Sequence, residues 1–418
     1  MLNRVFEGVR VVDPASGRDE IADFAVRDGM ILASGADTAG LPCEEARGKI
    51  LVPGFWDVHV HFRDPGNPDA ETRATGARAA AAGGFTHVVT MPNTTPAGDS
   101  AAWLREQLED ASLPIAVHPS ACVSRGRKGE EPVDFDALAA AGAAAFTDDG
   151  NMVVSEDVMR TAMTACARLG KPVMDHAVVP AIARGGVIRD TPLARRLGLP
   201  VFPPEAEIEA ARRDIRLCEE TGCRLDIQHV SCAGTVALIR EARARGLPVT
   251  GEATPHHLAL AAEEIPDDNA AYKMNPPLGL RADVKAIREG VLDGTLSLFA
   301  TDHAPHTAVA KAKGFAGAPF GIIGLETAIG VTWNVMVEGA GLPVLEWVRR
   351  WTCNPAALLG LPPPTLAAGS LADFVLVDPC VERVVDPGTF VSKSVNTPFA
   401  GWTLHAVPVL TVWKGVVR

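Results

Sequence analysis

His59 and His61 lie two positions apart at the end of an apolar segment, VPGFWDVHVHFRDPG. Because side chains two positions apart on a β-strand point to the same face, an extended segment here directs both imidazoles to one place. A strand can offer two nitrogen ligands to a metal ion in this way. Arg63 follows at the same spacing, so the pattern also predicts a cation beside that metal. A His-x-His pair alone is weak evidence for a metal site. The evidence becomes strong if other strands end in further His and Asp residues.

Short apolar segments alternate with Ala- and Leu-rich helical stretches through the middle of the chain. This alternation is typical of βα units around a parallel sheet. Eight such segments can be distinguished, which predicts an α/β fold with a TIM-like (β/α)8 barrel. The expected strands are FWDVHVHF (55–62), THVVTMPN (86–93), PIAVHPSAC (114–122), AAAFTDD (143–149), PVMDHA (172–177), RLDIQHVS (224–231), PVTGEATPHH (248–257) and LSLFATDHAPH (296–306). Helices are expected at 155–169, 205–221, 235–245 and 281–292.

Both ends of the chain have a different character, because they consist of short β-rich runs broken by turn signals. VRVVDP, DFAVRDGMILASG and KILVPG near the start resemble SLADFVLVDP and AVPVLTVWKGVVR near the end in this respect. We therefore expect a small composite β domain formed by both termini. The predicted division is 1–52 and 366–418 for the two parts of the β domain, and 53–365 for the barrel.

Candidate chemical groups gather where the expected strands end, and TIM barrels carry their active sites at that face. The four imidazoles of His59, His61, His176 and His229, with two carboxylates, are more than one tetrahedral zinc needs. They suit two metal ions about 3.5–4 Å apart that share a carboxylate and a hydroxide. The groups at the strand ends are His59, His61, Asn93, Asp148, Asp149, His176, His229, Asp302, His303 and His306.

A bridging ligand must carry negative charge to reduce the repulsion between two cations. A carboxylated lysine does this in some binuclear metal sites. No lysine lies between Lys128 and Lys171, so the fourth expected strand cannot supply one. We expect Asp149 to bridge, with Asp148 as the alternative, because adjacent residues on a strand face opposite ways and only one can reach the metals.

The remaining histidines are expected to have other roles. His87, His118 and His405 lie at strand starts, in mid-strand or in the terminal β region, and we interpret them as structural. His256 and His257 end the seventh expected strand without an evident partner, so a role in supporting a metal ligand stays open for them.

Composition restricts the classes of partner. The formal net charge is -12, which makes a nucleic acid an unsuitable partner. No apolar stretch approaches the roughly 20 residues that a membrane-spanning helix needs. The first residues lack an apolar signal region, and the eight cysteines form no C-x-x-C pair. We therefore expect a cytoplasmic protein with reduced thiols and without a thiolate zinc site.

An ordered set of motifs resembles the class I dihydroorotases of the amidohydrolase superfamily. The motifs are HVHFRDPG, MPNT, FTDDG, DHA, QHVS, KMNPP and ATDHAPH, followed by GAPFGIIGLETA and NTPFAGW, and they extend from about Val52 to Trp402. The resemblance implies zinc, reversible cyclisation of N-carbamoyl-L-aspartate to (S)-dihydroorotate and water, and a place in de novo pyrimidine (UMP) synthesis.

Position by position, the resemblance assigns roles to individual residues. It implies two zinc ions per chain, bridged by Asp149 and a hydroxide, and it gives Asp302 the catalytic proton transfer. The implied metal ligands are His59, His61, Asp149, His176, His229 and Asp302. The implied substrate contacts are His61, Arg63, Asn93, Asn275 and His306, with the backbone of Phe320 and Gly321.

Two positions depart from the family pattern. Asp64 stands where family members usually have a glutamate, and MDHAVV lacks the Cys and Glu pair that often follows the histidine of strand five. Neither change removes an implied ligand, but the second leaves open what supports His176.

The residue types also suit the implied chemistry. The guanidinium of Arg63 can pair with both oxygens of a substrate carboxylate, and asparagine amides add directional hydrogen bonds. An aspartate beside the metals can carry the proton between water and the ring nitrogen. The segment 303–321 is rich in Gly and Ala, and we expect it to form a long loop that contacts or covers the substrate.

Three other interpretations remain. A dihydropyrimidinase or hydantoinase shares the fold and the metals but does not need an arginine for an acid group, and an allantoinase is a further cyclic amidohydrolase. A dihydroorotase-like scaffold for aspartate carbamoyltransferase would have lost ligands, whereas every ligand position is filled here. We expect a homo-oligomer, and the sequence leaves association with aspartate carbamoyltransferase open.

Overall fold

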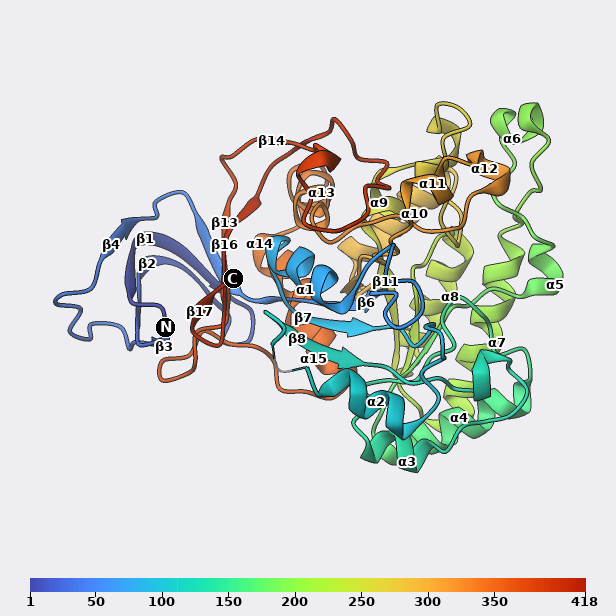
Figure 1. Cartoon of the computed structure of the whole chain (residues 1–418), viewed down its shortest axis with the longest axis horizontal. Helices are drawn as coiled ribbons and strands as arrows, with labels where there is room; N and C mark the ends of the chain where they lie inside the picture. The colour runs from blue at the N-terminus through green and yellow to red at the C-terminus, as the bar shows by residue number, and fades with distance from the viewer. Residues whose placement is uncertain (111) are drawn as a thin grey trace.

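The structure is a computed structural model that describes residues 1–110 and 112–418. It is an α/β protein in which a sheet at one end adjoins a larger body of parallel strands and helices (Figure 1). Both termini lie at that sheet, which Figure 1 shows at the left in blue and red. The β-rich ends of the sequence therefore correspond to one part of the structure, and the middle with its alternating strands and helices corresponds to another.

Strands from both ends of the chain form one eight-stranded sheet, in the order β17-β16-β13-β5-β1-β2-β3 with β4 paired to β1. β5 joins the two halves, because it pairs in parallel with β1 and antiparallel with β13. Phe6, Phe24 and Phe374 meet edge to face in the core of this sheet. The strands are β1 (Arg4–Asp13), β2 (Arg18–Arg27), β3 (Met30–Ile31), β4 (Cys43–Glu45), β5 (Ile50–Pro53), β13 (Phe374–Asp378), β16 (Val407–Trp413) and β17 (Val416–Val417).

The larger body contains two runs of parallel strands, β6-β7-β8 and β9-β10-β11-β12. Single bridges connect the runs, because Phe146 pairs with Ala121 after β8 and with Val173 in β9, and Val60 in β6 pairs with His303 after β12. The parallel pairing therefore returns to its first strand. The strands are β6 (Phe55–Val60), β7 (Phe85–Thr90), β8 (Ala116–Pro119), β9 (Val173–Asp175), β10 (Leu225–Ile227), β11 (Val249–Ala253) and β12 (Leu298–Phe299).

Helices follow most of these strands and pack around them. The longer ones are α1 (Arg73–Ala82), α2 (Ala101–Leu108), α3 (Phe135–Ala140), α4 (Glu156–Leu169), α7 (Glu205–Thr221), α8 (Ala233–Ala244), α10 (Arg281–Leu292), α14 (Val344–Trp351) and α15 (Cys353–Leu359). The shorter ones are α5 (Pro180–Ala183), α6 (Pro192–Leu197), α9 (Pro255–Ala259), α11 (Ala308–Lys311), α12 (Gly314–Gly317) and α13 (Ala328–Thr332). A short pair, β14 (Arg383–Val384) and β15 (Thr403–Leu404), lies apart from the other sheets.

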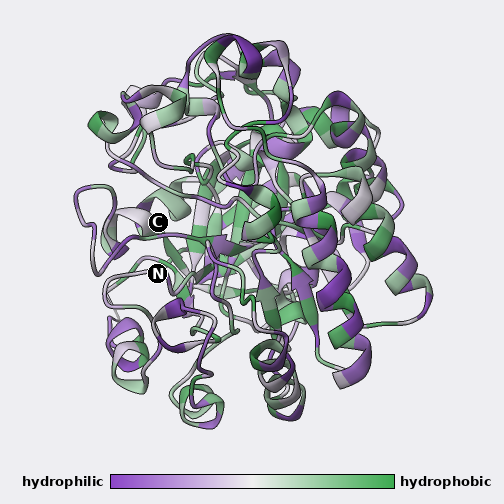
Figure 2. Cartoon of the chain, turned by 90° about the vertical axis from the view of Figure 1, so that its right-hand side faces the viewer, coloured by the Kyte–Doolittle hydropathy of each residue, from purple (hydrophilic) through white to green (hydrophobic). Residues whose placement is uncertain are grey.

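Helix α4 shows how local sequence sets these boundaries. Ser155 precedes the helix, and its hydroxyl accepts the backbone N–H of Val158, which would otherwise be unpaired. Gly170 ends the helix with φ 66°, a left-handed conformation that favours glycine. The buried face follows helical spacing and consists of Val158, Met159, Ala162, Met163 and Cys166. Figure 2 shows the same division on a larger scale, with hydrophobic residues concentrated on the central strands and hydrophilic ones on the outer helices.

The expected helices at 155–169, 205–221, 235–245 and 281–292 match α4, α7, α8 and α10, but three expectations about other segments were wrong. The fourth expected strand is reduced to the bridge at Phe146, because only one residue pairs with both neighbouring strands. The seventh strand stops at Ala253, since Thr254 caps α9, and His256 and His257 lie in that helix rather than in a strand. The segment after β12 contains α11 and α12, so it is not an irregular loop throughout.

None of the helices in the described part of the chain combines the length and the hydrophobicity that a bilayer-spanning helix requires.

Candidate active site

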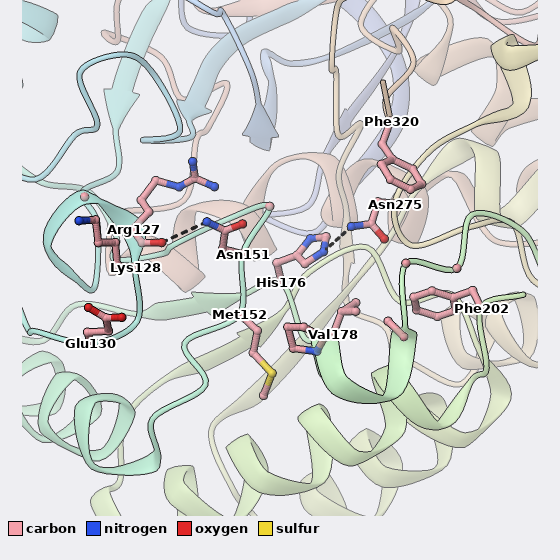
Figure 3. Close-up of a pocket in the computed structure, with 16 residues that line it drawn as sticks. Arg127, Lys128, Glu130, Asn151, Met152, His176, Val178, Phe202, Asn275 and Phe320 are labelled. Atoms are coloured by element: carbon pink, nitrogen blue, oxygen red, sulfur yellow. Dashed lines mark hydrogen bonds between the residues drawn. The ribbon is translucent and has the colours of Figure 1, made fainter. Parts of the chain in front are cut away.

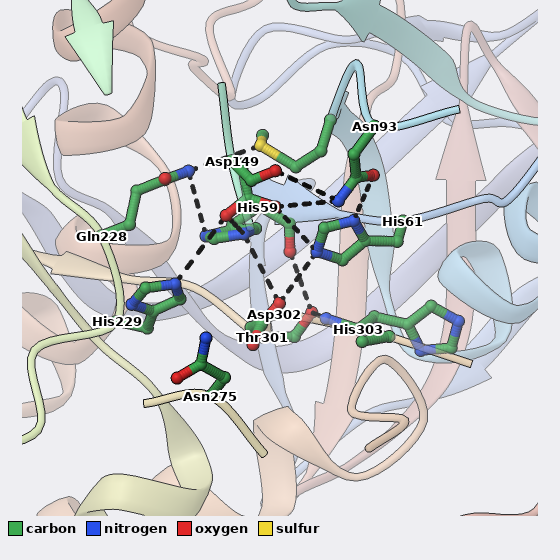
Figure 4. Close-up of polar contacts among 12 residues, drawn as sticks. His59, His61, Asn93, Asp149, Gln228, His229, Asn275, Thr301, Asp302 and His303 are labelled. Atoms are coloured by element: carbon green, nitrogen blue, oxygen red, sulfur yellow. Dashed lines mark hydrogen bonds and ion pairs between the residues drawn. The ribbon is translucent and has the colours of Figure 1, made fainter. Parts of the chain in front are cut away.

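Polar side chains from the carboxyl ends of several strands converge on one buried cluster (Figure 4). His59 lies in β6 and His61 directly follows it, so the period of two directs both rings inward, with their centroids 5.4 Å apart. His176 directly follows β9, and His229 lies two residues beyond β10. Parallel strands whose carboxyl ends meet at one edge explain why residues so far apart in the sequence become neighbours.

Asp149 lies at the centre of this cluster and faces all four histidines. Its Oδ1 is 3.3 Å from Nε2 of His59, 3.7 Å from Nδ1 of His176 and 3.8 Å from Nε2 of His229. Its Oδ2 is 3.4 Å from Nε2 of His61. Burial alone would raise the pKa of Asp149, but the neighbouring His59 and His61 outweigh it and hold that pKa well below its usual range.

Asp148 points away from the cluster. Its Oδ1 accepts the backbone N–H groups of Val123 at 2.8 Å and Ser124 at 3.1 Å, and its Oδ2 accepts the Ser124 hydroxyl. These bonds hold the chain that follows β8. The two adjacent aspartates thus face opposite ways, one toward the histidines and one toward the backbone.

Asp302 approaches the cluster from the end of the last parallel strand. Its Oδ1 lies 3.0 Å from Nε2 of His61 and 3.4 Å from Nε2 of His59. Burial opposes ionisation of this carboxyl, but the positive charge that His59 and His61 can carry lowers its pKa below the usual value. Asp302 therefore favours the ionised form, which can both bind a cation and accept a proton.

This donor set fits a metal ion. His59 Nε2 is buried and has no hydrogen-bond partner within residues 1–110 and 112–418, yet two carboxylates lie within 3.4 Å of it. A buried nitrogen without a donor or acceptor partner costs free energy unless something else binds it. Imidazole and carboxylate are also the ligands that zinc commonly takes. Two groups of residues have ligand atoms close enough to share an ion. The first is His59, His61 and Asp302, and the second is His59, Asp149 and His229.

A cavity of about 190 Å³ opens beside the cluster, and Arg63 forms part of its wall. The guanidinium donates through Nε to the carbonyl of Pro305 at 3.3 Å, and no ion pair joins it to a carboxylate in the described part of the protein. Burial lowers the pKa of Arg63 to about 10, so the side chain stays charged at neutral pH. Asp302 and Asp149 lie near enough to act on this charge, but neither is in contact with the guanidinium in the described structure, so Arg63 can bind a small anion from the cavity.

His306 and the segment that follows it complete that wall. Its Nε2 lies 2.6 Å from the carbonyl of Phe320, so this nitrogen carries the proton and donates it. Burial and the nearby Arg63 lower the pKa of His306 to about 3, which keeps the ring neutral. Lys311 donates to the carbonyls of Pro319 at 3.1 Å and Gly321 at 2.8 Å and so holds Phe320 between two fixed peptides.

Two asparagines connect the cavity with the cluster. The amide oxygen of Asn93 lies 2.9 Å from Nδ1 of His61, and its amide nitrogen donates to Oδ2 of Asp149 at 3.2 Å. Asn275 places its amide nitrogen 2.9 Å from Nε2 of His176. The sequence left open which residue supports His176, and in the structure Asn275 contacts it. All seven residues that the sequence singles out for substrate contact line the cavity, and they are His61, Arg63, Asn93, Asn275, His306, Phe320 and Gly321.

A second, larger cavity of about 670 Å³ adjoins the first (Figure 3). The two share the walls formed by Gly150, His176, Asn275 and Phe320. Arg127 lies on its far side and donates to the backbone carbonyls of Asp148 and Asp149. The smaller cavity thus opens toward a wider one, through which a ligand can reach the cluster.

Several residues of the site have a positive φ although they are not glycine. The angles are 57° at Arg63, 58° at Arg127, 33° at His229 and 49° at Asp302. Such conformations cost about 1–3 kcal/mol each and persist where surrounding contacts impose them. Their concentration here supports a functional role for these positions.

Three residues of the site were missed in the sequence. Glu252 in β11 is fully buried and lies 2.9 Å from Nδ1 of His59. Gln228 and Arg127 also reach the cluster or its backbone. Only Glu252 could have been noticed in the sequence, because it is a carboxylate in the middle of an apolar strand, PVTGEAT. A charged side chain buried there requires a partner. His87, His118, His256, His257 and His405, in contrast, are not among the residues that line either cavity.

The chain is similar to known proteins in sequence. The family described as dihydro-orotase-like matches residues 48–234. A dihydroorotase of Pelotomaculum thermopropionicum is 44% identical over 417 residues, which cover 99% of this chain and 97% of that protein. The chain belongs to the dihydroorotase family. A dihydroorotase of Anaeromyxobacter sp. (strain K) is 46% identical over 94% of this chain and 93% of its own length.

This member of the dihydroorotase family is also similar to solved structures of other enzymes. An L-hydantoinase (dihydropyrimidinase) from Arthrobacter aurescens has a TM-score of 0.86 and 26% identity, and the match covers 100% of this chain and 96% of that chain. A dihydropyrimidinase from Brevibacillus agri NCHU1002 has a TM-score of 0.85 at 24% identity over 100% and 95% of the two chains, which shows a shared fold.

Proposed function

We propose that this protein is a dihydroorotase, which reversibly cyclises N-carbamoyl-L-aspartate to (S)-dihydroorotate and water. The observation that carries the proposal is the position of Arg63, a charged side chain in the cavity wall without a carboxylate partner in the described residues. Dihydroorotate carries a free carboxylate, and an arginine can pair with both of its oxygens. The full-length relatives named dihydroorotase support the same activity.

We propose that two zinc ions bind at the buried cluster. His59, His61 and Asp302 would hold one ion, His176 and His229 the other, and Asp149 would lie between them as the shared ligand, since it faces all four histidines. When bound, the ions supply Lewis acidity that polarises the amide carbonyl and lowers the pKa of water to about 7. The carboxylates of Asp149 and Asp302 offset the positive charge that such ions bring into a buried site.

Asp302 is the residue that we expect to move the proton. In hydrolysis its carboxylate accepts a proton from the attacking water, and it then donates that proton to the ring nitrogen as the bond between this nitrogen and the carbonyl carbon breaks. The carbonyl carbon becomes the side-chain carboxylate of N-carbamoyl-L-aspartate, and the nitrogen becomes its terminal amide. Ring closure follows the same path in reverse, with Asp302 accepting a proton from the ureido nitrogen.

The cavity residues would bind and orient the substrate. Arg63 would hold the free carboxylate, and Asn93 and Asn275 would add hydrogen bonds from their amides, beside the histidines that they already contact. The neutral His306 would add a hydrogen bond, and the backbone of Phe320 and Gly321 would bound the ring. His61 would contact substrate as well as metal, because it lines the cavity.

The strand pairing supports a (β/α)8 barrel for the central body, since parallel pairs and single bridges run from β6 round to His303 and back. We retain the division into 1–52 and 366–418 for the β domain and 53–365 for the barrel. The reaction belongs to pyrimidine synthesis, and we expect a homo-oligomer in solution. Association with aspartate carbamoyltransferase is a further expectation that a pull-down with the transferase would test.

A hydantoinase or dihydropyrimidinase is the second candidate, because the L-hydantoinase structure matches the whole chain. Asp149 stands at the centre of the cluster here, whereas those enzymes usually bridge their metals with a carboxylated lysine. Steady-state assays of the purified protein with dihydroorotate, dihydrouracil and hydantoin separate the two. We expect kcat/KM for dihydroorotate to exceed the others by at least about 100-fold, since the uncharged rings leave Arg63 unpaired. Preference for an uncharged ring would refute the proposal.

A further inference from the structure

Glu252 contacts two of the four clustered histidines with one carboxylate oxygen. The side chain is fully buried in β11, on the strand next to β10. Its Oε2 lies 2.9 Å from Nδ1 of His59 and accepts the backbone N–H of His229, also at 2.9 Å. A single buried carboxylate thus ties together residues that come from β6 and from the end of β10.

The contact with His59 determines which ring nitrogen carries the proton. A carboxylate accepts hydrogen bonds, so Nδ1 of His59 must be the donor. A histidine must be neutral to bind metal, and in that form the lone pair of Nε2 is free. Nε2 is the atom that faces Asp149 at 3.3 Å and Asp302 at 3.4 Å. The amide nitrogen of Gln228 lies 3.4 Å from Nδ1, but it is itself a donor and cannot accept this proton.

The contact with His229 acts on the backbone rather than on the ring. His229 has a φ of 33°, a strained conformation for a residue with a Cβ atom. The hydrogen bond from its N–H to Glu252 helps to hold that conformation, and the conformation turns the ring toward Asp149. The same carboxylate thereby controls the tautomer of one histidine and the direction of another.

We propose that Glu252 is a positioning residue that prepares His59 and His229 to bind metal. The inference rests on the proposed metal centre, and it adds a residue that does not itself touch the metal or the substrate. Buried carboxylates that orient metal-binding imidazoles raise the basicity of the ligand and fix its geometry. Glu252 would do so for ligands of both proposed metal positions at once.

Metal binding by the apo-protein tests this role without measuring activity. The protein is stripped with a chelator and titrated with Co²⁺, and the dissociation constants, the stoichiometry and the visible absorption of the bound cobalt are recorded. We compare the wild type with Glu252→Ala and Glu252→Gln. Glu207→Gln is the matched control, because Glu207 is also buried and accepts the backbone N–H of Ser231, but it contacts no proposed ligand.

We expect Glu252→Ala to bind cobalt about 10- to 100-fold more weakly than the wild type, with an altered absorption spectrum. Glu252→Gln keeps an oxygen acceptor but loses the charge, so we expect a smaller loss in the same direction, and this variant decides the matter if Glu252→Ala does not fold. Glu207→Gln should bind as the wild type does. Equal affinity and spectrum in wild type and a folded Glu252→Gln or Glu252→Ala would overturn the role of Glu252. A wild type that binds no cobalt would overturn the metal centre itself, and this inference with it.

Discussion

Asp302 and His61 meet across the site, with Oδ1 of the aspartate 3.0 Å from Nε2 of the histidine. The carboxylate therefore lies where it can share a cation with the imidazole, and it also borders the cavity in which a substrate would bind. The same group can accept a proton from water and return it to the ring nitrogen.

Replacing Asp302 with Asn should remove the proton carrier while keeping the size and buried position of the side chain. We expect kcat for dihydroorotate to fall by about 10²–10⁴-fold or more, since general acid–base catalysis contributes that much. Steady-state kinetics measure the loss, and circular dichroism checks that the variant is folded. Near-normal turnover would exclude Asp302 as the proton carrier.

Arg63 should act on substrate binding rather than on the chemical step. Replacing it with Ala removes charge-assisted hydrogen bonds worth about 1.5–3 kcal/mol, which corresponds to a roughly 10- to 150-fold rise in KM. Arg63→Lys is the informative comparison, because it keeps the charge but not the two-pronged geometry, and we expect it to recover only part of the loss. An unchanged KM in Arg63→Ala would show that another group binds the carboxylate.

Asp149 and Asp148 should respond to substitution in different ways, although they are adjacent. We expect Asp149→Asn to lower the metal content of the purified protein, because its carboxylate faces all four histidines. Asp148→Ala should keep the metal but lower the free energy of unfolding by about 1–3 kcal/mol, because buried backbone N–H groups of Val123 and Ser124 lose their acceptor. Elemental analysis and urea unfolding measure the two effects. Metal loss in the Asp148 variant alone would reverse the assignment.

We expect His118 to make the free energy of unfolding fall at acid pH, independently of the metal site. It is partly buried, stacks on Trp56, and has its Nε2 3.0 Å from Nδ1 of His87. Burial, with the positive charge of His87 and Lys171, lowers the pKa of His118 from 6.5 to about 4. Below pH 6.5 the unfolded chain therefore binds more protons, and the stability that the neutral ring contributes is lost as the pH falls toward 4.

Replacing His118 with Gln should remove this dependence. Between pH 7 and pH 5 the free energy of unfolding should fall by about 1–2 kcal/mol less in the variant than in the wild type. Urea unfolding at both pH values measures the difference. Equal changes in the two proteins would mean that His118 does not titrate as its surroundings indicate.

Much of the site could be predicted because it follows a simple period. His59 and His61 share a face since strands repeat every two residues, and the other clustered residues lie near them because parallel strands end at one edge. The sequence favoured Asp149 over Asp148 as the bridging residue but left Asp148 as the alternative, because the strand pattern does not show which aspartate accepts the backbone N–H groups of Val123 and Ser124.

The remaining features depend on contacts that no local pattern encodes. Glu252 is one carboxylate in one strand, and its partner His59 is 193 residues away in the sequence. The fourth expected strand shortens to Phe146, because its length depends on how far its neighbours extend. Lys311 lies in a segment whose composition suggests an irregular loop, yet it anchors the carbonyls of Pro319 and Gly321.

The most direct test of the proposed function measures dihydroorotate hydrolysis and zinc content on the same preparation. We predict turnover with about two zinc ions per chain, loss of turnover when a chelator removes them, and recovery when zinc is restored. A protein that carries two zinc ions and hydrolyses no dihydroorotate would contradict the proposal.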